Sequence, residues 1–476
     1  MLPTDPLLPP FRPPLALLSC LSLSMLLASL GTSIANVGLP ALAQAFDASF
    51  PSVQWVVLAY LLAMTTAVLS AGRLGDLIGR RRLMLGGLAL FIGASALCGA
   101  APGLWTLVAA RVAQGMGAAV LMTLAMALAS EAAPTRRTGS AMGLLGTMSA
   151  AGTALGPALG GALLAGRGWR AMFLVNLPLG ATAFWLAWRH LPRDQPRAAQ
   201  PPAGFDWLGS TLLALTLAAY ALSMTVGRGS FGLRNAVLLA AAAGGAGLFA
   251  RIQSRSAHPL VRPGMLRNGA LAGGFAANAL VATVMMATLV VGPFYLAGAL
   301  GLDAARVGLA MACGPLVAAV AGMPAGRCVD RFGARPMTLV SLFTMAGTSA
   351  ILPVASQAFG VTGYVIALAT ITAAYALFQA ANNTAVLTGA GGDRGAVSGM
   401  LNLSRNLGLI TGASAMGAVF AAGVGTAELA DASPLALASG LRAAFVTAAL
   451  LCLLAAASVT ASRPKLAADR ARSARS

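Results

Sequence analysis

The chain alternates long, uncharged apolar stretches with short polar breaks along nearly its whole length. An apolar stretch of about 20 residues is long enough to cross a bilayer as a helix. The hydropathy pattern predicts fourteen such helices. They fall near residues 15–39, 53–72, 83–101, 104–130, 139–164, 169–190, 205–226, 235–252, 270–297, 304–325, 336–356, 361–386, 396–421 and 440–461. We therefore expect an all-α integral membrane protein.

Two longer breaks divide the predicted spans into groups of six, two and six. The linker RHLPRDQPRAAQPPAG follows the sixth span, and the break RIQSRSAHPLVRPGMLRNG follows the eighth. Both are basic and contain prolines that stop a helix. The expected parts are an N-terminal six-helix bundle, a linker with two inserted spans, a C-terminal six-helix bundle and a basic cytoplasmic tail. Their boundaries are 1–190, 191–268, 269–462 and 463–476.

Composition supports the membrane interpretation. Hydrophobic residues make up 58% of the chain, charged residues only 9%, and the mean hydropathy is +0.81. These values are far from those of a soluble domain. The net charge of +19 could suggest a nucleic-acid partner, so the placement of the basic residues has to decide.

The basic residues gather on one side of the predicted spans. With an internal N-terminus, six of the 31 Lys and Arg fall on the outer side and two, Arg111 and Arg405, fall inside spans, which leaves 23 on the inner side. Cytoplasmic loops of membrane proteins carry such an excess. We therefore expect a multi-pass protein of the inner (cytoplasmic) membrane, embedded in lipid, with both termini in the cytoplasm and no nucleic-acid partner.

One inner loop carries more than a topology signal. The stretch GRLGDLIGRRR occupies 72–82, and a second copy, GRCVDRFGARP, begins 254 residues later at 326–336. Both copies read G-x-x-x-D-x-x-G, and both follow the second span of a six-helix group. An internal repeat of this kind is typical of a transporter built from two related halves, with its substrate bound between them.

Four further motifs accompany the repeated loop. They are TSIANVGLP at 32–40, LVAARVAQGMGAA at 107–119, GTALGPALGG at 152–161 and WRAMFLVNLPLG at 169–180. Together, in this order, the motifs resemble those of the major facilitator superfamily, specifically its fourteen-helix drug:proton antiporter branch. The resemblance covers nearly the whole chain. It implies the major facilitator fold, in which two six-helix bundles are joined here by two inserted helices.

The resemblance also implies a conformational latch at the inner side. Asp76 and Arg80 stand four residues apart and share a helical face if the turn between them is helical. In the family this pair engages an acid at the inner end of the fourth span and the N-terminus of a helix that here opens near 396, which favours the outward-open state. A purely topological role would explain the arginines but not Asp76. The expected latch residues are Gly72, Gly75, Asp76, Gly79, Arg80, Glu131, Asp330 and Arg331.

Charged residues inside the spans are further candidates. A charge at membrane depth costs at least about 2.5 to 3.5 kcal/mol and indicates function by default. Arg111, with Gln114, and Arg405 are therefore coupling candidates. The alternative role for Arg111 is that of a hydrogen-bond donor between helices.

Other positions suggest helix packing and a cavity. The small residues of the fifth-span motif form a groove for a neighbouring helix, with a kink at its proline. The resemblance implies that this groove faces the other half and is linked to export. The motif residues are Gly152, Gly156, Pro157, Gly160 and Gly161. The residues proposed to line a substrate cavity are Thr32, Asn36, Tyr60, Met64, Asn278 and Met285.

The sequence argues against enzyme chemistry. The single lysine, Lys465, lies in the tail, which excludes a Walker A motif and a Schiff-base lysine. The five cysteines are scattered, and nothing near His190 or His258 resembles a metal or catalytic constellation. We expect no enzyme activity, no metal and no cofactor.

These observations predict a monomeric secondary transporter that exports small lipophilic organic molecules, drugs included, by alternating access coupled to protons. A dedicated transporter of one metabolite and a receptor or scaffold without transport are the alternatives. The resembled branch usually carries an acid where this chain has Gly31, and none of the 12 acids falls near mid-membrane. We therefore expect neutral or anionic compounds to be preferred over quaternary cations.

Overall fold

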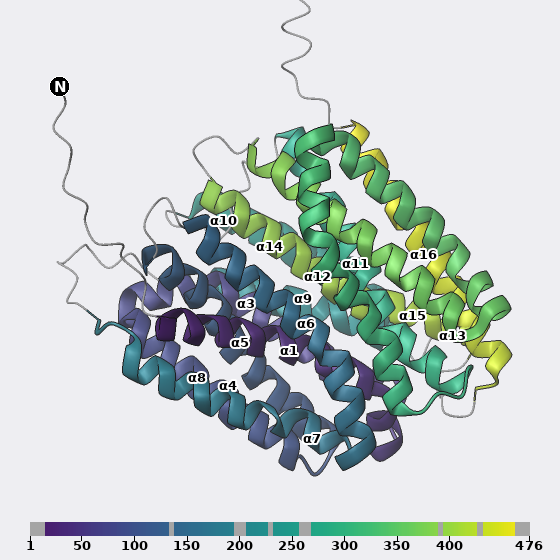
Figure 1. Ribbon diagram of the computed structural model, residues 1–476, viewed down its shortest axis with the longest axis horizontal. Helices are drawn as coiled ribbons and strands as arrows, with labels where there is room; N and C mark the ends of the chain where they lie inside the picture. Colours follow the sequence, from purple (N-terminus) through teal and green to yellow (C-terminus); the bar gives the residue numbers. More distant parts are fainter. Residues whose placement is uncertain are drawn as a thin grey trace, which may run out of the picture.

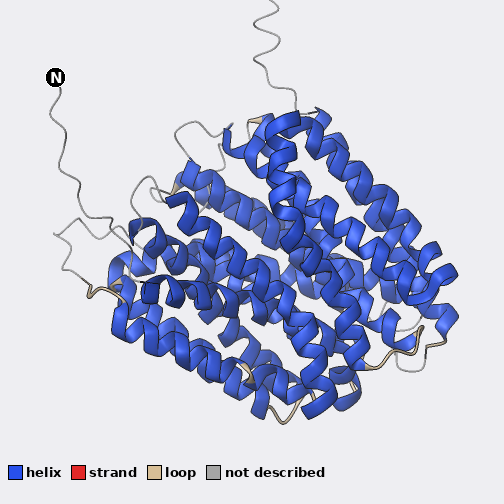
Figure 2. Cartoon of the chain, viewed as in Figure 1, coloured by secondary structure: helices blue, strands red, loops and turns tan. Residues whose placement is uncertain are grey.

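The computed structural model describes residues 15–132, 138–194, 206–226, 232–256, 268–388, 394–425 and 432–461. Within these ranges every regular element is a helix (Figure 2). The expectation of an all-α protein is therefore confirmed. The predicted tail at 463–476 lies outside the described residues.

The first six predicted spans are all helical. They correspond to α1 (Leu15–Ala45), α2 (Phe50–Val53) with α3 (Trp55–Ile78), α4 (Arg80–Ala100), α5 (Leu104–Ala132), α6 (Thr138–Arg167), and α7 (Trp169–Leu174) with α8 (Asn176–His190). The second span is divided at Gln54 and the sixth at Val175, so each of these spans consists of two consecutive helices.

The remaining eight predicted spans are helical as well. They correspond to α9 (Trp207–Thr225), α10 (Leu233–Arg255), α11 (Gly269–Gly298), α12 (Ala304–Phe332), α13 (Ala334–Thr388), α14 (Arg394–Thr411) with a π-helical turn (Gly412–Met416) and α15 (Gly417–Val424), and α16 (Pro434–Ala461). The 55 residues of α13 contain two predicted spans, because the chain reverses at Gly360, where φ is +59°. Glycine accepts this backbone conformation because it lacks a Cβ atom.

Twelve helical segments in the described ranges are long and apolar enough to cross a membrane. α13 counts once among them although it contains two predicted spans, and α6 is not among them. When the two arms of α13 and α6 are counted separately, the helices agree with the prediction of about fourteen spans.

The helices form two groups that lie side by side (Figure 1). We call α1–α8, purple to blue, the N-terminal half and α11–α16, green to yellow, the C-terminal half. The halves meet where α6 packs on α12, α3 on α14 and α1 on α11. α9 packs on α10, on α3 and on the π-helical turn. The inserted pair therefore flanks the seam between the halves and does not separate them.

The predicted orientation gives names to the two ends of the molecule. The outer end carries the turns after α1, α4, α6 and α11 and the reversal of α13. The inner end carries the two copies of the repeated loop, one between α3 and α4 and the other between α12 and α13. The repeated loops thus occupy corresponding places in the two halves.

Candidate functional site

The two copies of the repeated loop have the same backbone turn. Gly79 separates α3 from α4 with φ +99° and ψ 133°, and Gly333 separates α12 from α13 with φ +88° and ψ 152°. A residue with a Cβ rarely adopts such a positive φ, which explains why glycine ends the motif in both copies. The predicted repeat is therefore visible in the backbone as well as in the sequence.

This turn corrects one prediction about the latch. Because Gly79 is not helical, Asp76 lies near the end of α3 and Arg80 is the first residue of α4, so the two do not share a helical face. Arg80 is half-buried. The side chains of Asp76 and Glu131 lie outside the described residues, and their engagement with α14 stays a prediction.

The other predicted latch residues have two kinds of surroundings. Gly72 and Gly75 face α5, where an added Cβ would lie 3.5 Å and 2.9 Å from the nearest side-chain atom. Gly75 in particular allows α3 and α5 to approach closely. In the second copy, Asp330 and Arg331 are exposed at the inner end of α12.

A carboxylate from the linker caps the helix that follows the first copy. Asp194 accepts hydrogen bonds from the backbone N–H groups of Arg81 at 2.9 Å and Arg82 at 3.2 Å, at the start of α4. A negative charge stabilises this position because the first N–H groups of a helix are unpaired and carry partial positive charge. No local sequence signal predicts the contact, since Asp194 lies 113 residues after Arg81.

Arg111 is buried within the N-terminal half and is 0% exposed. Its Nε donates to the Val56 carbonyl at 2.8 Å and its Nη1 to Gln114 Oε1 at 2.6 Å, and Gln114 donates to Ser95 Oγ at 2.7 Å. Nη2 has no hydrogen-bond partner among the described residues. Arg405 on α14 is half-buried, and its Nε likewise lacks a partner within those ranges. Each half thus holds an incompletely paired arginine inside a span.

Tyr60 lies between Arg111 and the position of the missing acid. The Cζ of Arg111 is 4.1 Å from the centroid of the Tyr60 ring, within cation–π range. The hydroxyl group of Tyr60 donates to the Ala28 carbonyl at 2.7 Å and would lie 2.9 Å from a Cβ added to Gly31. An aromatic ring, and not a carboxylate, therefore occupies the space between position 31 and the buried cation.

Most of the residues proposed for a substrate cavity are packed inside the halves. Asn36, Met64 and Asn278 are buried, while Thr32 and Met285 are half-buried. Asn278 on α11 donates to two oxygen atoms of α14, at 2.8 Å and 2.9 Å. Asn36 Oδ1 and Asn278 Oδ1 are buried without a partner among the described residues. The sequence therefore identified polar positions in the first span of each half. None of the residues proposed for the cavity lines the surface groove of α13 or the pocket at the inner ends of α4 and α8.

Three glycines of the α6 motif pack within the N-terminal half. They are Gly152, Gly156 and Gly160. A Cβ added at any of them would meet α1 at 3.1 Å or less. The expectation that this groove faces the other half is wrong for these three residues, because their small size serves the contact with α1.

The end of the same motif does reach the other half. A Cβ added to Gly161 would lie 2.7 Å from the Ala304 carbonyl and 2.8 Å from the Cα of Gly308 on α12. The Pro157 carbonyl also lies beside Gly308, 2.7 Å from where its Cβ would be. The backbones of α6 and α12 therefore touch at the outer end, which only glycine permits at this distance.

Two further residues of the N-terminal half, Phe50 and Gln54, contact the other half at the outer end. The Phe50 ring packs edge-on against Phe294 of α11 and Phe420 of α15, with centroids 4.8 Å and 5.7 Å apart. Gln54 Nε2 donates to the Ala413 carbonyl in the π-helical turn at 2.7 Å. Neither Phe50 nor Gln54 was predicted, because no motif marks them and the partner of Gln54 lies 359 residues away.

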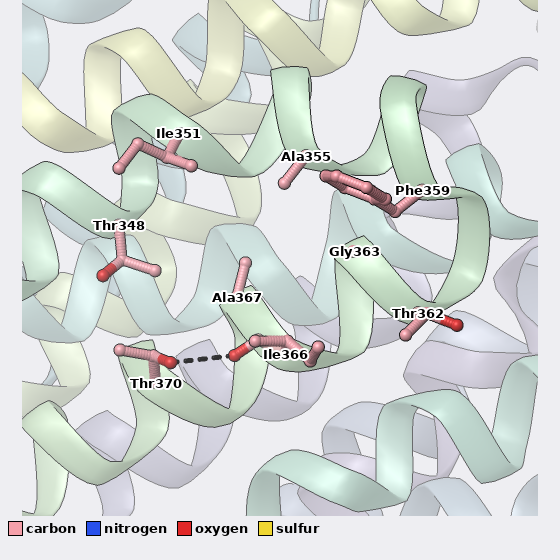
Figure 3. A pocket seen from close by; sticks show the side chains of 9 residues that line it. All are labelled: Thr348, Ile351, Ala355, Phe359, Thr362, Gly363, Ile366, Ala367 and Thr370. Carbon is pink, nitrogen blue, oxygen red and sulfur yellow. Dashed lines mark hydrogen bonds between the residues drawn. The ribbon is translucent and has the colours of Figure 1, made fainter.

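One surface pocket lies away from this seam. It is a groove of about 630 Å³ between the two arms of α13, and all of its lining residues belong to that helix (Figure 3). Three apolar residues of its wall, Ile351, Phe359 and Ile366, are 60%, 73% and 62% exposed. Apolar side chains this exposed on a membrane protein face lipid, so the groove belongs to the lipid-facing surface and not to a route between the halves.

Comparisons of sequence point to one family. The chain matches the model of the Major Facilitator Superfamily over residues 21–413 and 274–475. It is 34% identical over 394 residues to YebQ, an uncharacterized transporter of Escherichia coli (strain K12), covering 82% of this chain and 85% of that protein. It is 32% identical over 420 residues to the drug efflux pump JefA of Mycobacterium tuberculosis, covering 84% and 80% of the two chains. It is 30% identical over 415 residues to the multidrug resistance protein Stp of the same species, covering 86% and 76%.

Solved structures share the fold. A bacterial homolog of the human lysosomal transporter Spinster, in an inward-facing and unoccupied conformation, superposes with a TM-score of 0.68 at 17% identity, covering 95% of this chain and 97% of the other. The xylose transporter XylE from E. coli gives a TM-score of 0.63 at 15% identity, covering 94% and 99%.

Proposed function

We propose that this protein, which belongs to the major facilitator superfamily and is a multi-pass membrane transporter and not an enzyme, exports small lipophilic organic molecules from the cytoplasm in exchange for protons. Relatives at 30% and 32% identity that are named for multidrug resistance and drug efflux support export of drugs. The observation that carries the mechanism is the seam, where the halves touch through backbone, aromatic and amide contacts at the outer end.

Such a seam suits alternating access. Among the described residues, the outer contacts between the halves contain no ion pair, so these contacts can separate without uncovering a charge. We place the opposing closure at the inner end, where the two repeated loops carry Asp76, Arg80, Asp330 and Arg331. The moving bodies are then the bundles at 1–190 and 269–462, which rock about a cavity at mid-membrane.

The charges of the spans favour neutral or anionic cargo. Among the described residues, the acids that lie within helices are Asp76, Glu131 and Asp330, each within two residues of an inner end. Arg111 and Arg405 are the charges deep in the spans. At ~8 Å and an effective dielectric constant of ~20, each opposes a monovalent cation by roughly 2 kcal/mol before screening. The proton is then carried by Asp76, by Glu131 or by an ionisable group of the cargo.

A flux assay tests this proposal. Purified protein in proteoliposomes with an imposed proton gradient should transport neutral and anionic lipophilic dyes. It should transport the cation ethidium much more slowly. Absence of gradient-driven flux for the whole panel would refute export. Rapid ethidium flux by the native protein would refute the charge preference alone.

Restoring the missing acid requires two changes, because Gly31→Asp alone would place its Cβ against the Tyr60 hydroxyl. The test variant is Gly31→Asp with Tyr60→Phe, which removes that oxygen. Its matched control is Gly31→Asn with Tyr60→Phe, which has the same shape and no charge. We expect ethidium transport to rise in the Asp variant only, since the carboxylate lowers the positive potential near Arg111.

A further inference from the structure

The inner ends of α4 and α8 enclose a small basic pocket. It has a volume of about 400 Å³ and is lined by Arg81, Trp188, Arg189, Leu191 and Arg193. Arg81 belongs to the first repeated loop, while the other residues come from the last turn of α8 and the linker after it. Three arginines therefore line one pocket, which lies beside α4 and α8 of the N-terminal half and away from the seam.

Among the described residues, no carboxylate pairs with the arginine side chains that line this pocket. Arg81 Nη2 donates to the Trp188 carbonyl, and its buried Nε has no hydrogen-bond partner in the described ranges. Arg189 and Arg193 are exposed and have no hydrogen-bond or ion-pair partner there either. The carboxylate of Asp194 is bound to the backbone N–H groups at the start of α4, so the helix terminus is already occupied. The arginine side chains are therefore the groups that can bind a ligand here, and a ligand that pairs with them has to be an anion.

Two tryptophans place this pocket at the membrane surface. Trp185 and Trp188 lie one turn apart near the inner end of α8 and are 54% and 57% exposed. Tryptophan gathers at the level of the lipid headgroups, because its ring is apolar and its N–H group is polar. Arginines directly beyond such a belt lie among the headgroups, and the charge count predicts that this is the cytoplasmic leaflet.

We propose that the pocket binds the phosphate group of an anionic phospholipid, such as phosphatidylglycerol, from the cytoplasmic leaflet. The planar guanidinium groups of Arg81, Arg189 and Arg193 donate paired N–H groups that match phosphate oxygens. The exposed tryptophan rings contact the glycerol and the upper acyl chains. A free phosphate ion offers the same oxygens without the acyl chains, whose burial adds affinity for a lipid.

The bound lipid would join two segments that matter for transport. Its headgroup contacts the first repeated loop through Arg81 and the linker to the inserted helices through Arg193. The lipid thus strengthens a connection that the chain itself makes through Asp194.

Native mass spectrometry of the full-length protein in mild detergent tests the site. Delipidated protein is titrated with phosphatidylglycerol, with phosphatidylcholine and, separately, with inorganic phosphate. The test variant is Arg189→Gln with Arg193→Gln. The matched control, Arg251→Gln with Arg255→Gln, removes two exposed arginines at the inner end of α10. A third variant, Arg189→Lys with Arg193→Lys, keeps the charge.

We expect the native protein and the control to bind phosphatidylglycerol alike, and the Gln pair to bind it about 30-fold more weakly, since each arginine near an anionic headgroup contributes about fivefold to the affinity. The Lys pair should lie between them. Equal binding by the Gln pair and the control would overturn the site. Equal binding of phosphatidylcholine would overturn the requirement for an anionic lipid. If millimolar inorganic phosphate saturates the pocket and phosphatidylglycerol binds no more tightly than phosphate does, the pocket is a site for free anions instead.

Discussion

The sharpest prediction concerns the contact between α6 and α12. Replacing Gly161 by alanine adds one Cβ atom, which would lie 2.7 Å from the Ala304 carbonyl and 2.8 Å from the Cα of Gly308. Ordinary contact begins at 3.4 Å, so the atom is 0.7 Å and 0.6 Å too close to its neighbours. Because both neighbours are backbone atoms, no side-chain rotation relieves the clash, and the two helices must move apart.

The size of the effect follows from the cost of overpacking. Inserting a methyl group into a tight contact typically costs about 1 to 3 kcal/mol. Here the cost falls on the state in which the outer end is closed, because the contact joins the two halves. The ratio of outward-open to outward-closed molecules should therefore rise about 5- to 150-fold. Gly166→Ala is the matched control, since it lies on the same helix and its Cβ would meet nothing within 4 Å.

Pulsed electron paramagnetic resonance can measure this shift. Spin labels are attached to cysteines that replace Arg170 and Leu435, which are exposed at the outer ends of the two halves, after replacement of the five native cysteines. We expect Gly161→Ala to add a population with a longer distance between the labels, and Gly166→Ala to leave the distribution unchanged. A distribution for Gly161→Ala that matches the control would refute both the tight contact and its role in closure.

Three further predictions test other parts of the molecule. Asp76→Asn should abolish most gradient-driven flux while leaving expression and insertion intact, because the latch needs the anion and insertion needs only the arginines; wild-type flux would reduce the motif to a topology signal. Arg111→Lys should lower flux and thermal stability, since a lysine cannot donate to both the Val56 carbonyl and Gln114 with the planar fork that arginine uses; unchanged flux would remove Arg111 from the mechanism. A reporter enzyme that is active only on the outer side of the membrane should be inactive when fused to the tail at 463–476, because this tail is predicted to be cytoplasmic. Activity of the fused reporter would contradict the fourteen-span topology.

The spans and the repeat could be predicted because they depend on local properties of the sequence. The apolar stretch predicted at 205–226 became α9, Trp207–Thr225, within two residues at each end. The repeated loop was recognisable from spacing alone, and its last glycine proved to be the residue with positive φ in both halves. A helix boundary of this kind is encoded by the one residue type that can adopt the turn.

The contacts that build the seam and cap the loop could not be predicted in the same way. Gln54 donates to a carbonyl that lies within the π-helical turn after α14, and no composition signal predicts that turn. The absence of an acid at Gly31 was visible in the sequence. The sequence did not reveal that Tyr60 fills the space beside Gly31, because this depends on how α1 and α3 are positioned against each other.

The different chemistry of the two ends leads to a last prediction. The outer contacts are aromatic rings, glycine backbones and one amide, whereas the inner loops carry exposed charges such as Asp330 and Arg331. Raising the salt concentration from 0.1 M to 1 M shortens the Debye length from about 10 Å to about 3 Å and weakens exposed charge pairs most. High salt should therefore open the inner end and shorten the distance between the outer labels on Arg170→Cys and Leu435→Cys. Asp76→Asn should respond less, because its latch lacks the charge that salt screens. An equal response of both proteins would show that closure of the inner end does not depend on Asp76.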